Sequence, residues 1–179
     1  QDILEMLDNV LQKFIDNAPD HIARAKFSAM RERSIGVGAL GFHAYLQKKG
    51  MPWESALAKS ANIRMFRHIR KGLDAANLKL GKERGEAPDA EGTGRRCSHV
   101  MAVAPNASSS IIMGNTSPSI EPWRANAYRQ DTLSGSFLNK NKYLDKLLRQ
   151  KCEEDSSLDY DKLWSSIIAN DGSVQNLKC

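Results

Sequence analysis

GRRCSHVMAVAPNASSS, residues 94–110, joins an apolar run to a cluster of small polar residues through a proline. Residues 99–104 are compact and apolar, which predicts a short buried strand. Pro105 ends this strand because it has no backbone N–H to donate. Residues 106–110 then predict a small polar loop, and Ile111 to Met113 a short helix. The stretch therefore predicts a strand, a loop and a helix in succession.

Such a loop presents unpaired backbone N–H groups at the positive end of a helix dipole, where anions bind readily. Small side chains let a phosphate approach the backbone, and serine hydroxyls add rotatable donors. Serine and asparagine are equally favoured as plain helix caps, so both interpretations stay open at this point. Anion sites lie at the carboxyl ends of strands, which favours the phosphate site. The candidate phosphate-binding residues are Asn106, Ala107, Ser108, Ser109 and Ser110.

The next segment, GNTSPSIEPWR (residues 114–124), contains two prolines and a glycine and predicts an irregular loop. Long ordered loops in compact domains are usually functional. Glu121 could be a catalytic acid or a structural hydrogen-bonding group, and we favour the structural role. Asn115 and Glu121 are candidate supporting residues of the site.

The rest of the chain is mainly helical in pattern. A long helix is expected to begin at the capping residue Ser55 and to end at Gly81 and Gly85. Residues 34–41 predict a short buried strand or tight turn, and residues 85–96 a loop. Residues 125–132 and 137–138 suggest an irregular hairpin. Further helices are expected over residues 2–16, 20–30, 42–48, 139–152 and 159–169.

GVGALG (residues 36–41) fits the glycine pattern of dinucleotide-binding proteins, so a nicotinamide-dependent oxidoreductase is one alternative function. That pattern requires a preceding apolar strand and an acidic residue about twenty positions later. Arg31 to Ser34 precede the run instead, and Glu54 comes too early. Close packing of a helix against a strand explains these glycines better.

The net charge of +5 suggests an anionic partner, and a basic helical nucleic-acid-binding module is a second alternative. Arg64, Arg67, Arg70 and Lys71 fall on one helix face, but no stacking aromatic residues alternate with them. We therefore favour ordinary surface charge. A hydrophobic content of 41% with 26% charged residues is typical of a soluble globular domain, here residues 1–179.

Cysteine and histidine give little support for a metal site. Cys97, Cys152 and Cys179 form no CxxC pair, and the four histidines form no ligand pattern. Cys97 lies between basic residues and the apolar run, and we expect a small buried side chain rather than a nucleophile. The odd, sparse cysteine count fits a reducing compartment.

Four segments together resemble the large (catalytic, alpha) subunit of class I ribonucleotide reductases, in the branch shared by eukaryotes and large tailed phages. They follow in the same order as in that family, and the resemblance covers nearly the whole chain. The segments are RERSIGVGALG (31–41), GRRCSHVMAVAPNASSS (94–110), GNTSPSIEPWRANAY (114–128) and LSGSF (133–137).

The resemblance implies an α/β fold, with residues 1–179 a helix-rich, partial domain of the family's ten-stranded α/β barrel. It implies an enzyme that reduces ribonucleoside diphosphates to deoxyribonucleoside diphosphates in the cytoplasm, or in the host cytoplasm for a phage protein. Residues 106–110 match the family's substrate-phosphate loop. The run 36–41 becomes a junction between a barrel strand and a helix.

The resemblance also implies what this chain lacks. The radical cysteine is expected upstream of Gln1 and the radical-carrying tyrosines beyond Cys179, so the chain is expected to be an internal piece, inactive alone and without catalytic residues. No cofactor or metal is expected to bind it directly. The whole enzyme is expected to need a small subunit with a radical cofactor and a thioredoxin or glutaredoxin reductant. A large-subunit homodimer is implied, with neither membrane nor nucleic acid as partner.

Overall fold

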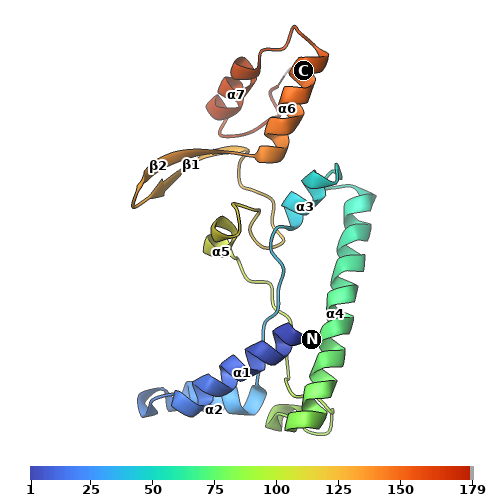
Figure 1. Ribbon diagram of the computed structural model, residues 1–179, viewed down its shortest axis with the longest axis vertical. Coiled ribbons are helices and arrows are strands. Elements are labelled where there is room, and N and C mark those ends of the chain that lie inside the picture. Colours follow the sequence, from blue (N-terminus) through green and yellow to red (C-terminus); the bar gives the residue numbers. More distant parts are fainter. Residues whose placement is uncertain (178–179) are drawn as a thin grey trace.

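The computed structural model describes residues 1–177 as an elongated, mainly helical chain with one hairpin (Figure 1). Two short 3-10 turns, Asp20–Ile22 and Pro88–Ala90, supplement the regular elements. The helices are α1 (Asp2–Asn17), α2 (Ala23–Glu32), α3 (Phe42–Lys48), α4 (Ala56–Arg84), α5 (Ala107–Ile112), α6 (Lys142–Glu154) and α7 (Tyr160–Ala169). The strands are β1 (Ala127–Thr132) and β2 (Gly135–Lys140).

The long helix α4 runs along one side of the molecule, and α1 and α2 pack near its C-terminal end (Figure 1). Two extended segments, residues 34–41 and 99–105, run through the middle. The hairpin, α6 and α7 lie at the opposite end from α1 and α2. The short helix α5 therefore sits in the middle of the molecule, between the extended segments and the hairpin.

Local capping signals set the limits of α4, as the sequence predicts. The Ser55 hydroxyl accepts a hydrogen bond from the Ala58 amide at 3.1 Å, so it caps the first turn. Gly85 ends the helix with a φ of 83°, a conformation that glycine adopts without steric cost. Among the described residues, no helix combines the length and apolar character needed to cross a bilayer.

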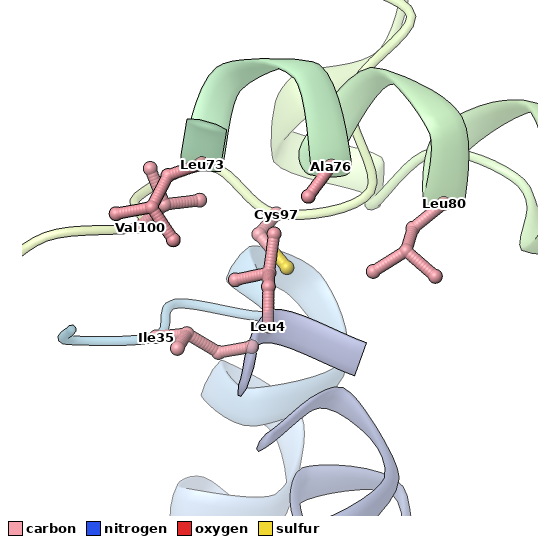
Figure 2. Packing of buried hydrophobic residues seen from close by; sticks show 7 residues of the cluster. All are labelled: Leu4, Ile35, Leu73, Ala76, Leu80, Cys97 and Val100. Carbon is pink, nitrogen blue, oxygen red and sulfur yellow. The ribbon is translucent and has the colours of Figure 1, made fainter. Parts of the chain in front are cut away.

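One apolar core joins α1, α4 and the two extended segments (Figure 2). Leu4 of α1 is fully buried in this core, and the Cys97 side chain lies between α1 and α4. The full set of buried members is Leu4, Ile35, Leu73, Ala76, Leu80, Cys97 and Val100. The core fixes the start of the segment that leads to α5.

A buried carboxylate holds the same elements together through charge. Asp8 of α1 is 1% exposed, and it accepts hydrogen bonds from Arg33 at 2.7 and 2.9 Å and from Arg84 at 2.8 Å. Arg96 adds a longer contact at 3.3 Å. Burial alone would raise the pKa of Asp8, but these hydrogen bonds and positive charges hold it below its ordinary value.

The predicted buried strand over residues 99–104 is wrong in its extent. The structure has a single parallel bridge there, between Val37 and Met101, and Val103 is 66% exposed. The backbone bonds that join the two segments include Ile35 N to His99 O at 3.0 Å and Val37 N to Val100 O at 3.1 Å. A strand needs neighbours on which to pair and pack, and within residues 1–177 this segment has one short neighbour only.

The hairpin is more regular than the sequence suggests. β1 and β2 pair without a bulge, from Ala127 opposite Lys140 to Thr132 opposite Gly135. β2 extends to Lys140, so the next helix begins later than predicted, where the Asn141 side chain accepts the Tyr143 amide at 3.0 Å. α6 and α7 then enclose a second core with β1, formed by Ala127, Leu148, Leu163, Trp164 and Ile167.

Candidate functional site

Helix α5 begins at Ala107, four residues before the predicted start at Ile111, so the predicted loop is largely its first turn. Asn106 precedes it with a φ of 53° and a ψ of 31°, the left-handed conformation that asparagine tolerates better than most residues. Ala107, Ser108 and Ser109 are exposed. Their N–H groups belong to the first turn, where a helix provides no acceptor for them.

Ser110 differs from the other four candidate residues because it is buried, at 4% exposure. Its amide donates to Asn106 O at 2.9 Å, and its hydroxyl donates to Ala107 O at 2.8 Å. Its carbonyl accepts the Thr116 amide at 3.0 Å. Ser110 therefore fixes the turn, while Ser108 and Ser109 are exposed residues of the first turn.

Asn115 connects the end of α5 to the hairpin. Its backbone is left-handed (φ 52°), and its side-chain oxygen accepts a hydrogen bond from the Tyr128 hydroxyl at 3.0 Å. Its side-chain nitrogen donates to Asn139 Oδ1 at 3.3 Å. Tyr128 and Asn139 are paired across the two strands. These two residues were not identified from the sequence, which placed Asn139 in the following helix rather than in the hairpin opposite Tyr128.

Glu121 is exposed, and its side chain makes no hydrogen bond or ion pair with any residue that the structure describes. Its neighbours in the loop have a clearer role. Ser117 accepts the Ala44 amide through its hydroxyl at 3.0 Å and the Gly41 amide through its carbonyl at 2.9 Å. Ser119 O accepts the Phe42 amide at 3.4 Å. The loop thus occupies the amides at the start of α3.

This occupation argues against the dinucleotide site at residues 36–41. A pyrophosphate would require the same amides that Ser117 and Ser119 already bind. The glycines instead allow two backbones to approach, since a Cβ on Gly36 would lie 2.8 Å from Ala102 Cβ. One on Gly38 would lie 2.5 Å from Ala102 O. Close packing is their role here, but of one extended segment against another rather than of a helix against a strand as expected.

A pocket of about 880 Å³ opens beside α5. Ala107, Ser110 and Ile111 of α5 form one side of it, and the hairpin and the end of α7 form the other. The lining also includes Arg124, in the loop before β1, and Arg129, in β1. The structure thus brings Ala107, the first residue of α5, and two arginines to one cavity, a combination suited to an anionic ligand, whereas Ser108 and Ser109 do not line it.

Cys97 is fully buried, as expected, and is no candidate nucleophile. Burial raises the pKa of its thiol to about 11, so the unreactive protonated form prevails at neutral pH. Cys179 lies outside the described residues. Across residues 1–177, no group of three or more His, Cys, Asp or Glu side chains is arranged to hold a metal ion.

A family model for the barrel domain of ribonucleotide reductase matches residues 1–93 and 88–178. The chain belongs to this family. Two relatives from invertebrate iridescent viruses are similar to almost the whole chain. The ribonucleoside-diphosphate reductase large subunit of Invertebrate iridescent virus 6 is 57% identical over 99% of this chain and 18% of its own length. That of Invertebrate iridescent virus 3 is 56% identical over 98% of this chain and 28% of its own length.

The fold is also that of a ribonucleotide reductase segment. The alpha subunit of the class Id ribonucleotide reductase of Actinobacillus ureae superposes with a TM-score of 0.82 at 37% identity. The match covers 98% of this chain and 31% of that subunit. The predicted family and fold class are therefore confirmed, and the chain spans less than a third of the length of these relatives.

Proposed function

We propose that this ribonucleotide reductase segment holds the diphosphate of a ribonucleoside diphosphate in an enzyme that reduces it to the deoxyribonucleotide. The observation that carries the proposal is the exposed first turn of α5, whose first residue, Ala107, lines the 880 Å³ pocket. The exposed amides of Ala107, Ser108 and Ser109 supply donors, and Asn106 directs the chain into this turn. The buried Ser110 stabilises this turn through its hydrogen bonds to the carbonyls of Asn106 and Ala107.

In this role the segment contributes positioning rather than bond chemistry. A diphosphate fixed on α5 restrains the attached ribose, and fixing a reactant in a productive orientation can supply much of a rate enhancement. Asn115 supports the site by tying α5 to the hairpin through Tyr128. The supporting role predicted for Glu121 has no contact behind it, because its exposed side chain makes no hydrogen bond or ion pair with the described residues.

The remaining requirements of the reaction come from outside these residues. We propose that a small subunit with a radical cofactor, a thioredoxin or glutaredoxin reductant and a second large subunit complete the enzyme. None of the described residues is assigned a catalytic role. The chain alone is expected to bind its substrate without converting it.

Substitution of Ala107 by aspartate tests the site. A carboxylate in the first turn stabilises a helix by about 0.3–1 kcal/mol but repels phosphate. We expect Ala107→Asp to weaken CDP binding about tenfold or more, measured by isothermal titration calorimetry, without loss of thermal stability. Ala56, the exposed first residue of α4, gives the matched control Ala56→Asp, which should bind CDP like the parent chain. Equal CDP affinity of both variants would contradict the proposal.

A further inference from the structure

The segment that forms the phosphate site carries almost no positive charge of its own. Between Arg96 and Arg124 the sequence contains no lysine or arginine, although a nucleoside diphosphate carries two to three negative charges near neutral pH. Main-chain amides contribute partial charges only, and α5 is a short helix of 6 residues. A strong diphosphate site therefore requires a full cation from another wall of the pocket.

Two guanidinium groups border the pocket, but they differ in their surroundings. Arg129 donates from Nε to Asp131 at 2.9 Å and from Nη2 to Ser136 at 2.8 Å. Its charge is balanced by a neighbouring carboxylate on the same strand. Arg124 is exposed, and among residues 1–177 it has no carboxylate within ion-pair distance. Arg124 is thus the arginine of this pocket whose charge is not already balanced.

Asp171 also borders this pocket, but it does not balance the charge of Arg124. Asp171 lies in the turn after α7 and lines the pocket, yet it forms no ion pair with either arginine in the described part of the chain. A phosphate bound near Asp171 would be repelled. An anion in this pocket is therefore favoured beside Ala107 and Arg124, which both line it, rather than beside Asp171.

The wall that carries Arg124 is held in a fixed relation to α5. Arg124 stands three residues before β1, and Tyr128 in that strand donates to Asn115, three residues after the end of α5. On its other side, the Asn126 amide donates to Gly172 O at 3.0 Å. Both bonds restrain the segment between the loop and β1, so the guanidinium need not order a free loop when it binds.

We propose that Arg124 is a substrate-binding residue whose guanidinium pairs with the diphosphate held on α5. This assignment rests on the proposed function and adds to it the cation that α5 lacks. A planar guanidinium can donate two parallel hydrogen bonds to phosphate oxygens, which fixes orientation as well as charge. Arginine is therefore preferred over lysine at this position, and the two residues are expected to differ in affinity.

Calorimetric titration of the 179-residue chain with inorganic pyrophosphate tests this assignment, with CDP and cytidine as further ligands. We expect Arg124→Gln to weaken pyrophosphate and CDP binding about tenfold and Arg124→Lys less severely. The matched control is Arg129→Gln, which removes a charge from the same pocket wall and should change the affinity less than about twofold. Thermal unfolding of each variant separates loss of binding from loss of structure.

The outcomes distinguish this inference from the proposed function. If Ala107→Asp abolishes binding while Arg124→Gln binds like the parent chain, Arg124 has no such role and the α5 site stands. If Arg124→Gln abolishes binding while Ala107→Asp has no effect, Arg124 binds the anion and the α5 site is wrong. Equal losses in Arg124→Gln and Arg129→Gln would indicate general surface charge and overturn the assignment. A parent chain that binds neither pyrophosphate nor CDP would overturn both proposals.

Discussion

Asp8 is the residue on which the α1 end of the molecule depends most. It pairs with Arg33 and Arg84 in a nearly solvent-free position, and Arg96 lies next to it. Loss of one partner from a buried ion pair leaves uncompensated charge and costs about 3 to 5 kcal/mol. We expect Asp8→Asn to lower the free energy of unfolding by about this amount, measured by urea denaturation. Asp74→Asn, at an exposed pair with Arg70, should cost less than about 1 kcal/mol.

The same carboxylate predicts a dependence of stability on pH. The pKa of Asp8 lies below its ordinary 3.8 in the folded chain, so its ionised form contributes stability above that value. This contribution is lost as the pH falls from about 5 through the folded pKa. The difference in unfolding free energy between the parent chain and Asp8→Asn should therefore shrink as the pH is lowered. A constant difference between pH 7 and pH 3 would contradict this account.

Cys97 gives a test by chemical reactivity. Its thiol is buried with a pKa of about 11, whereas Cys152 is partly exposed. At pH 8 we expect a maleimide reagent to label Cys152 and leave Cys97 unmodified, and denaturant should make both reactive. Peptide mass spectrometry can assign each label. Labelling of Cys97 in the native chain at the rate of Cys152 would show that the core in Figure 2 is open.

At the scale of the element, the contact between the two extended segments depends on Gly38. A Cβ at this position would lie 2.5 Å from the backbone oxygen of Ala102, so one segment would have to move. We expect Gly38→Ala to destabilise the chain by about 1–3 kcal/mol. Gly72 in α4 is the control, since a Cβ there meets open space and should stabilise the helix by about 0.5–1 kcal/mol. Chemical denaturation of both variants should give changes of opposite sign.

Elements with strong local signals could be predicted from the sequence. The limits of α3 agree with the predicted helix over residues 42–48, and Ser55 caps α4 as expected. The apolar run at 99–104 could not be assigned locally, because a strand requires a partner and its neighbours lie elsewhere in the chain. The sequence predicts a start of α5 at Ile111 instead of Ala107, because Asn106 and the following serines suit a loop, a cap or a first helical turn equally well.

In the candidate site too, residues within a local motif could be predicted and residues brought there by tertiary contacts could not. Residues 106–110 could be proposed from the sequence because one compact motif combines small polar side chains with the proline that ends an apolar run. Tyr128 and Asn139 could not be predicted, because they contact Asn115 only once β1 has paired with β2, and Arg124 lines the pocket only through the packing of the loop before β1. Sequence spacing does not reveal such contacts between distant segments.

At the level of the whole molecule, the chain spans only part of the length of its relatives. It covers 18%, 28% and 31% of the three relatives described, and α1 leaves a second apolar stripe exposed, with Ile3, Met6 and Val10 each more than half accessible. We expect the purified 179-residue chain, mixed with a small subunit and a reductant, to form no dCDP from CDP. Chromatographic detection of dCDP above a control without the chain would refute this expectation.

The central claim is that backbone amides in the first turn of α5 bind the diphosphate of a nucleotide. A titration followed by two-dimensional ¹H–¹⁵N NMR tests it directly, because each backbone amide gives its own signal. The claim predicts that CDP shifts the signals of Ala107, Ser108 and Ser109 in a saturable manner, while cytidine without phosphates leaves them in place. Saturable shifts that CDP produces elsewhere, with these three signals unmoved, would contradict it.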